Sequence, residues 1–371
     1  MDRLRVLSVF GTRPEAIKMC PLVLELEKRE QIDSFVCLTG QHRHMLDQVI
    51  DIFGIHVDDD LNIMRPKQTL TTITSDILNG MERVFAEIQP DVVLVHGDTS
   101  TSFAVALAAF YHKIAIGHVE AGLRTYNRYS PFPEEMNRCL TGRLADYHFA
   151  PTSNNARNLQ AEGIEKNIFI TGNTVIDAFK TTVKEGYLYK SPQLQGFDPK
   201  ARRTILMTAH RRENLGEPLV NICLAVKQLV QEFPDIQVVY PVHLNPAVRQ
   251  TVFEHLSGEE RISLIDPIDV EDMHNLMAAS YMVMTDSGGL QEEAPACGVP
   301  VLVLRTETER PEAVEAGTVK VVGVAQADIY REAVKLLTDT VHYSAMAQAV
   351  NPYGDGHASE RIVSHLIELH A

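Results

Sequence analysis

VVLVHGDTSTSFAVALAAFYHKIAIGH, residues 92–118, combines two short β-rich apolar runs with a longer apolar segment between them. The runs at residues 92–95 and 114–118 are rich in Val and Ile, which favour strands, and Asp98 stands just before the expected helix. Similar runs recur at residues 6–10, 35–39, 168–171, 205–208, 238–242, 282–285 and 301–304, with helical patterns such as 71–88 and 219–233 between them. This alternation predicts βαβ units built on parallel sheets.

Two α/β domains account best for this pattern, because 371 residues exceed what one hydrophobic core usually covers. The strand runs are continuously apolar, as expected when helices cover both faces of a sheet. We therefore predict two Rossmann-like, doubly wound domains that face a central cleft, at residues 1–172 and 173–352. The break NPYGDG at residues 351–356 precedes an amphipathic segment. Residues 353–371 are expected to form a C-terminal helix that packs back on the N-terminal domain.

The composition is that of an ordinary globular enzyme, with 45% hydrophobic and 22% charged residues. A net charge of −15 argues against duplex nucleic acid or an anionic membrane surface as partner. No apolar run approaches the roughly 18 residues that span a bilayer. The five cysteines are scattered without a C-x-x-C pair, which fits a reducing compartment. We expect a cytoplasmic protein without a targeting segment.

Nearly all unusual polar residues follow directly after one of the strand runs. Because parallel sheets bind ligands beyond the carboxyl ends of their strands, a shared site is expected there. The positions are residues 11–13, 41–42, 97–98, 120, 210–213, 243 and 286–289.

The turn DSGGLQEE, residues 286–293, joins a strand to a helix. Gly288 and Gly289 let backbone N–H groups approach a ligand closely. Together with the helix start and the Ser287 hydroxyl they suit phosphate oxygens. Glu293, about one turn later, suits the hydroxyls of a ribose. The alternative is an ordinary N-cap Asp or Ser beside a tight glycine turn.

Two further strand ends carry cationic residues. Arg13 and Lys18 stand in GTRPEAIK, residues 11–18, where Arg13 fits a pyrophosphate, although the segment has neither a G-x-G-x-x-G fingerprint nor a Walker A motif. His210 and Arg211 stand in HRREN, residues 210–214, and suit an anionic leaving group. His243 stands between two prolines. The alternatives are solvated surface charge for the two segments and a structural role for His243.

Three carboxylates belong to the ends of two strands and the helix that follows. Asp98 and Glu120 come after the runs at residues 92–95 and 114–118, and Glu134 opens the next helix. Asp98 and Glu134 have ordinary alternatives: an N-cap for Asp98, and for Glu134 a helix-dipole contact or an i,i+4 pair with Arg138. Together, facing a basic phosphate site, they favour proton transfer. The chain has no H-E-x-x-H motif and no Cys/His ligand spacing, so we expect no metal site.

Seven segments in order resemble the non-hydrolysing bacterial UDP-N-acetylglucosamine 2-epimerases. The resemblance extends from about residue 6 to the NPYGDG segment. The segments are VFGTRPEAIK (9–18), VHGDT (95–99), GHVEAGLRT (117–125), SPFPEEMNR (130–138), TAHRREN (208–214), PVHLNP (241–246) and TDSGGLQEEAP (285–295).

The resemblance implies a two-domain fold like that of the GT-B glycosyltransferases, in a homodimer. It implies interconversion of UDP-N-acetylglucosamine (UDP-GlcNAc) and UDP-N-acetylmannosamine (UDP-ManNAc) without NAD or a metal, supplying surface polysaccharides. Residues matching Asp98, Glu120 and Glu134 are the family's acid/base candidates, and a histidine matching His210 is required for activity. The implied substrate contacts are Arg13, Lys18, Arg138, His243, Ser287, Gly288, Gly289 and Glu293.

Family members from bacteria are also activated by a second molecule of UDP-GlcNAc. The resemblance implies that Gln41 and Arg211 contact this effector, together with Glu134 and His243. His44 and Lys67 stand where well-known members carry Gln and Arg.

The chemistry favours elimination over simple deprotonation, because the C2 hydrogen of the sugar is not adjacent to a carbonyl. Loss of UDP from C1 together with the C2 proton gives 2-acetamidoglucal, to which UDP adds back. Two faces of C2 need at least two proton-handling groups. A GT-B glycosyltransferase that uses a UDP-sugar and a non-catalytic nucleotide-sugar sensor are the alternatives.

Overall fold

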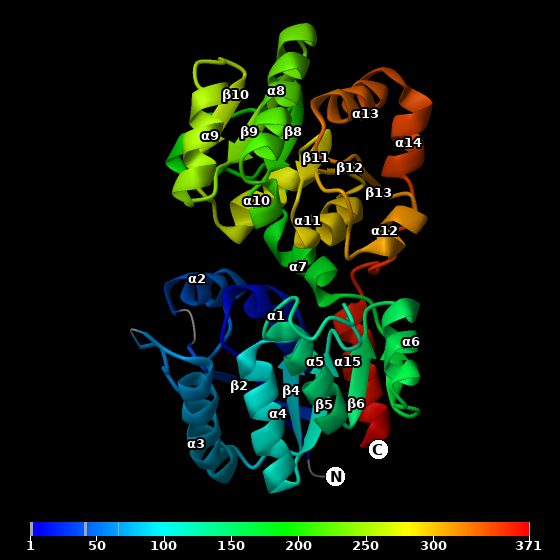
Figure 1. Ribbon diagram of the computed structural model, residues 1–371. Helices are drawn as coiled ribbons and strands as arrows, with labels where there is room; N and C mark the ends of the chain where they lie inside the picture. Colours follow the sequence, from blue (N-terminus) through cyan, green and yellow to red (C-terminus); the bar gives the residue numbers. More distant parts are fainter. Residues whose placement is uncertain (1–2, 41–42, 66, 371) are drawn as a thin grey trace. The chain divides into compact units, whose positions relative to one another are not determined.

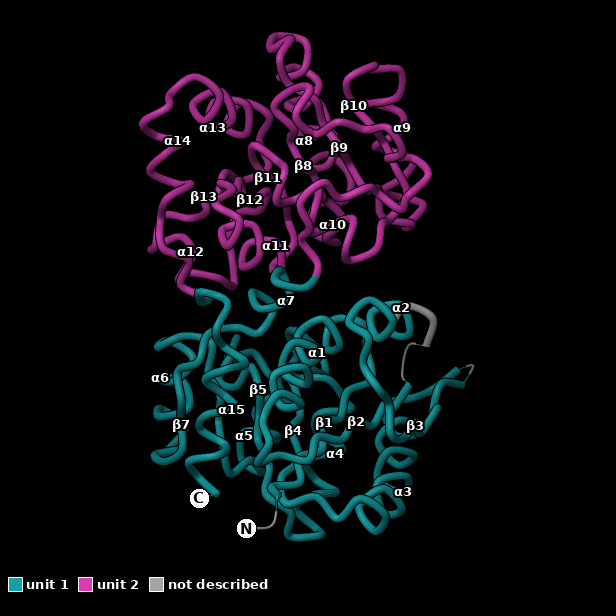
Figure 2. The backbone as a smooth tube through the Cα atoms, turned by 180° about the vertical axis from the view of Figure 1, so that it is seen from behind, with its two compact units in different colours: residues 1–181, 353–371 teal, residues 182–352 magenta. Residues whose placement is uncertain are grey.

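The computed structural model describes residues 3–40, 43–65 and 67–370, and of residues 43–45 it describes the backbone alone. The chain forms two compact units: unit 1 is Met1–Thr181 with Tyr353–Ala371, and unit 2 is Thr182–Pro352 (Figure 1; Figure 2). The predicted bound after residue 172 lies within unit 1, just before helix α7 (Thr174–Thr182). The predicted α/β class, with two doubly wound parallel sheets, is confirmed. The central cleft stays a prediction.

Unit 1 forms, within its described residues, a seven-stranded parallel sheet in the order β3-β2-β1-β4-β5-β6-β7. The order reverses between β1 and β4, and ligands of open α/β sheets bind at such a switch point. The strands are β1 (Leu4–Phe10), β2 (Ile32–Leu38), β3 (Asp59–Asp60), β4 (Val92–His96), β5 (Ala115–Val119), β6 (Tyr147–Ala150) and β7 (Ile168–Ile170).

The helices of unit 1 lie in two rows, as a doubly wound sheet requires. In one row α4 packs between α3 and α5, and in the other α1 packs between α2 and the C-terminal helix α15. His365 of α15 also stacks on Phe169 of β7, with ring centroids 4.2 Å apart. The helices are α1 (Arg13–Glu27), α2 (Arg43–Phe53), α3 (Leu70–Ile88), α4 (Ser100–His112), α5 (Glu134–Leu144), α6 (Ser153–Ala161), α7 and α15 (Ala358–Leu369).

The stretch 92–118 folds as a strand, a helix and a strand, as predicted. The N-cap of α4 is Thr99, whose hydroxyl accepts a hydrogen bond from the Ser102 N–H at 3.0 Å. The N-cap alternative for Asp98 is therefore wrong, and its side chain is available for another role. Small residues such as Ala104 and Ala109 are fully buried on α4, which lets the helix pack closely.

Unit 2, all of whose residues are described, forms a six-stranded parallel sheet in the order β10-β9-β8-β11-β12-β13. Its switch point lies between β8 and β11. The strands are β8 (Arg203–Thr208), β9 (Ile236–Pro241), β10 (Ile262–Ile265), β11 (Met282–Thr285), β12 (Val301–Val303) and β13 (Val319–Val321). The α-helices are α8 (Glu217–Glu232), α9 (Pro246–Leu256), α10 (Val270–Ala278), α11 (Gly288–Glu293), α12 (Pro311–Glu315), α13 (Gln326–Thr338) and α14 (Thr340–Ala347).

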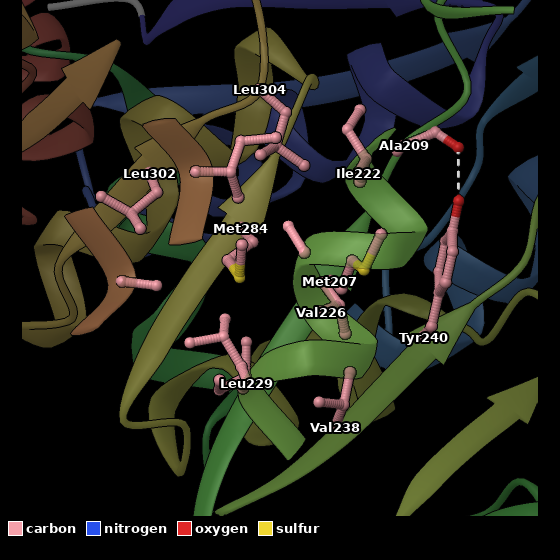
Figure 3. Packing of buried hydrophobic residues seen from close by; sticks show 14 of the residues in the cluster. Met207, Ala209, Ile222, Val226, Leu229, Val238, Tyr240, Met284, Leu302 and Leu304 are labelled. Carbon is pink, nitrogen blue, oxygen red and sulfur yellow. Dashed lines mark hydrogen bonds between the residues drawn. The ribbon is translucent and has the colours of Figure 1, made fainter. Parts of the chain in front are cut away.

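The core of unit 2 lies between its sheet and α8. Met207, Met284 and Leu302, from three neighbouring strands, are at most 1% exposed and gather beside this helix (Figure 3). Burying each such side chain stabilises the fold by about 1.5–3 kcal/mol. The Tyr240 hydroxyl donates a hydrogen bond of 2.6 Å to the carbonyl of Ala209 (Figure 3). This bond anchors the chain immediately before His210. Among the helices of the described residues, none is long and apolar enough to cross a membrane.

Three buried histidines of unit 1, His96, His118 and His148, lie in the neighbouring strands β4, β5 and β6. Burial lowers the pKa of His96 to about 4, that of His118 to about 3 and that of His148 to about 4. His118 and His148 are direct partners across β5 and β6, and the charge of Arg124 lowers the pKa of both. The Nε2 of His118 bonds the Gly97 carbonyl at 2.7 Å, so the neutral ring carries its proton on Nε2.

Acid should destabilise the protein through these histidines. Their folded pKa values lie below the unfolded value, so their contribution to stability is present above pH ~6.5 and is lost as the pH falls towards ~4. We expect a loss of roughly 2 kcal/mol per histidine at about pH 5. His148→Phe should weaken the pH dependence of thermal unfolding. His56→Gln, at a side chain that is 84% exposed, is the control. Equal acid sensitivity of both variants would contradict the assignment.

Candidate functional site

The loop after β1 is fixed by the carboxylate of Glu15. Oε2 accepts hydrogen bonds from the N–H groups of Gly11 and Thr12 at 3.1 and 2.8 Å, which completes the capping box of α1. Oε1 accepts from the hydroxyls of Thr99 and Ser102 at 2.6 and 3.2 Å, in the loop and helix after β4. Burial raises the pKa of Glu15, and these donors counteract the shift. One carboxyl group therefore joins two neighbouring strand ends.

Glu120 follows β5 in an uncommon backbone conformation. Its φ of 61° lies in the left-handed region, which is unfavourable for a residue with a side chain. The carboxylate forms an ion pair with Lys18 and accepts a hydrogen bond of 3.1 Å from the Asn173 side chain. Its Oε2 lies 3.7 Å from Nε2 of the buried His96. Strained backbone at a polar residue with such partners is typical of functional sites.

Asp98 lies in the loop after β4 and forms an ion pair with Arg138 of α5. Burial raises the pKa of Asp98 and nearby Glu120 adds to the rise, while Arg138 opposes it. A carboxyl group with a raised pKa holds its proton more readily than an ordinary one, as a general acid requires. Arg138 also lies 3.4 Å from Glu135. Its carboxylate partners are therefore Asp98 and Glu135, and not Glu134 as the i,i+4 spacing suggested.

A cavity of about 360 Å³ brings four of the predicted residues of unit 1 together. Lys18, Asp98, Glu120 and Glu134 all line it, with His96, Glu15 and Asn137 among the neighbours. Arg13 is the first residue of α1 and half-buried. Within residues 3–40, 43–65 and 67–370, no group of three His, Cys, Asp or Glu side chains is arranged to hold a metal ion.

Not every charge near this loop belongs to the site. Arg124, in the segment that follows Glu120, has a fully buried side chain and binds both carboxylate oxygens of Glu162 at 2.6 and 2.8 Å. This pair ties the loop to the end of α6 and has a structural role.

The second group of predicted residues lies at the switch point of unit 2. His210 and His243 stack face to face, with ring centroids 5.0 Å apart and an interplanar angle of 6°. Burial lowers the pKa of His210, and the charge of Asp286 opposes that shift. The ring therefore lies between a carboxylate and a second imidazole.

The Ser287–Gly288–Gly289 turn lies among cationic side chains. A Cβ added to Gly288 would lie 3.7 Å from a guanidinium nitrogen of Arg310 and 3.9 Å from one of Arg211. Two guanidinium groups beside the backbone of a glycine turn suit phosphate oxygens. Ser287 is the N-cap of α11, but its side chain makes no capping hydrogen bond. The N-cap alternative for its hydroxyl is therefore wrong.

Glu293, at the end of α11, lies 3.6 Å from Nε2 of His274. Its Oε1 would lie 3.0 Å from a Cβ at Gly289, so the carboxylate faces the turn. This is the placement expected of a ribose contact, a role that stays a prediction.

The predicted effector residues are only partly described. Gln41 and the His44 side chain lie outside the described residues. Lys67 is exposed, with a φ of 61°. Arg211 is described, and its guanidinium lies near Gly288. The effector site stays a prediction.

Several residues in contact with these groups were not predicted, among them Glu15, His96, Asn173 and Arg310. The capping-box spacing from Thr12 to Glu15 is a signal that could have identified Glu15. His96 directly follows the strand run at residues 92–95, two residues before Asp98, so its position is also a signal. Asn173 and Arg310 carry no local signal, because long-range folding alone brings them to their partners.

The chain is similar to a known family over nearly its full length. A family model described as UDP-N-acetylglucosamine 2-epimerase matches residues 24–367. The UDP-N-acetylglucosamine 2-epimerase of Bacillus subtilis (strain 168) is 58% identical over 99% of this chain and 96% of its own length. That of Escherichia coli (strain K12) is 52% identical over 98% of each chain. The crystal structure of UDP-GlcNAc 2-epimerase from Neisseria meningitidis bound to UDP-GlcNAc is 49% identical, with a TM-score of 0.88 over 98% of this chain and 100% of that chain.

The loop that carries Glu120 leaves no room for a side chain at Gly122. A Cβ there would lie 2.2 Å from the carbonyl oxygen of Asn155, at a φ of 92°. Gly122→Ala should therefore cost several kcal/mol, roughly 3 or more, and lower both the unfolding temperature and the activity.

Gly163→Ala is the matched control, because its φ is 81° and no described atom lies within 4 Å of its Cβ. This variant introduces the backbone strain without the collision, and it should lower the free energy of unfolding by about 1 kcal/mol. Thermal unfolding of both variants separates the two effects. Equal destabilisation would mean that the collision at Asn155 is relieved by movement of the loop.

Proposed function

This chain belongs to the family of UDP-N-acetylglucosamine 2-epimerases, and from that premise we propose that it interconverts UDP-GlcNAc and UDP-ManNAc. The observation that carries the proposal is the cavity of unit 1, where Asp98, Glu120 and Glu134 lie with Lys18. Carboxylates gathered in one cavity are unfavourable for stability and suited to proton transfer.

The reaction proceeds by elimination and re-addition. A base removes the C2 proton while the C1–O bond breaks and its electron pair leaves with UDP, which gives 2-acetamidoglucal. UDP then adds back to C1, and an acid protonates C2 on the opposite face. This route needs proton-handling groups at C2 and stabilisation of a diphosphate leaving group.

Unit 1 supplies the proton-handling groups. Glu120, which contacts Lys18 and Asn173, acts as the proton acceptor. Asp98, with its raised pKa, is suited to hold and return a proton. Glu134 completes the set. Arg13 and Arg138 bind the substrate or orient these carboxylates.

Unit 2 supplies the nucleotide contacts. The Ser287–Gly288–Gly289 turn binds the diphosphate, with support from Arg310, and Glu293 binds the ribose. His210 stabilises the charge of the departing diphosphate, with His243 stacked beside it.

Further proposals concern the setting of the enzyme. We propose a cytoplasmic homodimer that supplies N-acetylmannosamine units for surface polysaccharides. We also propose activation by a second UDP-GlcNAc, through Gln41, His44, Lys67 and Arg211.

Heavy water tests the reaction directly. Incubated with UDP-GlcNAc alone, the protein should form UDP-ManNAc and incorporate deuterium at C2 of both sugars, with traces of UDP and the glycal, as seen by NMR. Epimerisation without exchange at C2 would overturn the elimination route.

The same spectra separate the alternatives. A glycosyltransferase would need an acceptor and would make no UDP-ManNAc, whereas a hydrolysing enzyme would release free N-acetylmannosamine. A sensor would bind UDP-GlcNAc without exchange at C2.

Glu120→Gln tests the proton acceptor. The amide keeps the shape of the side chain but cannot accept the C2 proton, so turnover should fall by roughly 10²–10⁴-fold. The control is Glu165→Gln, at an exposed position of unit 1, which should keep wild-type turnover. Near-normal activity of Glu120→Gln would return Glu120 to a structural role.

A further inference from the structure

Asp286 is a fully buried carboxylate immediately after β11. Its Oδ2 accepts hydrogen bonds from the backbone N–H groups of His210 and Arg211 at 2.7 and 2.8 Å. It accepts a third, of 3.0 Å, from the Asn214 side chain. One oxygen of Asp286 therefore fixes the backbone of the loop that carries His210.

The other oxygen is unusual. Among the described atoms, Oδ1 of Asp286 has no hydrogen-bond partner although it is buried. A buried carboxylate oxygen without a partner is costly and rare. The Nδ1 atom of the His210 ring lies 3.5 Å from Oδ1. This is slightly beyond a hydrogen bond, and such contacts of unliganded sites often tighten when substrate binds.

We propose that Asp286 is a positioning residue for His210, whose Nδ1–H it accepts so that Nε2 is presented to the diphosphate. The role given to His210 rests on the proposed function. As the C1–O bond breaks, its electron pair moves onto the phosphate oxygen, and a proton on Nε2 of His210 donates a hydrogen bond to the diphosphate. The Nδ1 proton stays on the ring and is not transferred to Asp286.

The neighbouring ring of His243 has the opposite arrangement at Nδ1, which accepts a hydrogen bond instead of donating one. Nδ1 of His243 accepts a hydrogen bond of 3.1 Å from the Asn245 N–H, so neutral His243 carries its proton on Nε2. The two stacked imidazoles thus differ in the kind of partner at Nδ1: a backbone N–H donor for His243 and a carboxylate acceptor for His210. A carboxylate behind Nδ1 sets both the tautomer and the orientation of an imidazole.

The groups that face His210 explain why the carboxylate matters. Burial lowers the pKa of His210, and so do the charges of His243 and Arg211. Asp286 is the one group acting in the opposite direction among these influences. Without it, the imidazolium would lose its proton at a lower pH.

Asp286→Asn tests the proposal. The amide oxygen can still accept from the His210 and Arg211 N–H groups, but its NH₂ would face Nδ1 and favour the other tautomer. We expect kcat to fall roughly 10²–10⁴-fold with little change in KM. The limb of the pH–rate profile at which protonated His210 is lost should move to lower pH.

Nitrogen-15 NMR of histidine-labelled protein reads the tautomer without reference to activity. The His210 signals are identified by their absence in His210→Gln. Neutral His210 should carry its proton on Nδ1 in the wild type and on Nε2 in Asp286→Asn. Should Asp286→Asn fail to fold, the wild-type spectrum alone decides: a proton on Nε2 there would overturn the proposal.

Thr208→Val is the matched control, because its hydroxyl pairs with that of Thr285 at 2.6 Å in the same buried layer. It should lower the unfolding temperature but leave the His210 tautomer and the pH limb in place. If Asp286→Asn changes neither the tautomer nor the pH limb, Asp286 is structural only and the proposal fails. If wild-type protein shows the expected tautomer but no exchange at C2, the proposed function fails while the Asp286–His210 pairing stands.

Discussion

The parallel pairing of buried strands is the constraint on which the candidate site depends. In unit 1, β1, β4 and β5 are adjacent, so the loops that carry Arg13, Asp98 and Glu120 meet at one edge of the sheet. In unit 2, β9, β8 and β11 are adjacent, so His243, His210 and Asp286 meet in the same way. In each unit two of these strands flank the switch point, where helices diverge and leave space for a ligand.

Gathering polar groups at one edge has an energetic consequence. Each buried charge must find a partner, because an unpaired one is costly. Unit 1 meets this requirement with ion pairs, Lys18 with Glu120 and Arg138 with Asp98, and with the hydroxyl and N–H donors around Glu15. These partners hold the carboxylates in position. The same contacts therefore lower the cost of burying the carboxylates and keep them where proton transfer needs them.

The sequence was sufficient to predict the fold class and to place the chemistry at strand ends, because continuous apolar runs and Gly- or Pro-containing turns are local signals. Strands without a continuous apolar run were harder: β3 (Asp59–Asp60) consists of two acidic residues, and Lys320 interrupts β13 (Val319–Val321).

The contacts between charged side chains were the least predictable feature. The spacing of Glu134 and Arg138 suggested a local pair, yet Arg138 binds Asp98, which is 40 residues away. The approach of Arg310 to Gly288 likewise has no counterpart in local sequence. These contacts depend on which strands become neighbours, and the order of strands in a sheet is a property of the whole chain.

The kind of partner that a buried carboxylate has indicates what it can do. Asp98 and Glu120 bind the charged side chains of Arg138 and Lys18 rather than backbone groups, and a side chain can exchange such a contact for one with a substrate. Asp286 binds two backbone N–H groups, which cannot move away as a side chain can. A carboxylate held in this way is unsuited to exchanging protons with a substrate and well suited to orienting a neighbouring imidazole. The difference in partners therefore accounts for two uses of the same functional group, at equivalent places in two similar sheets.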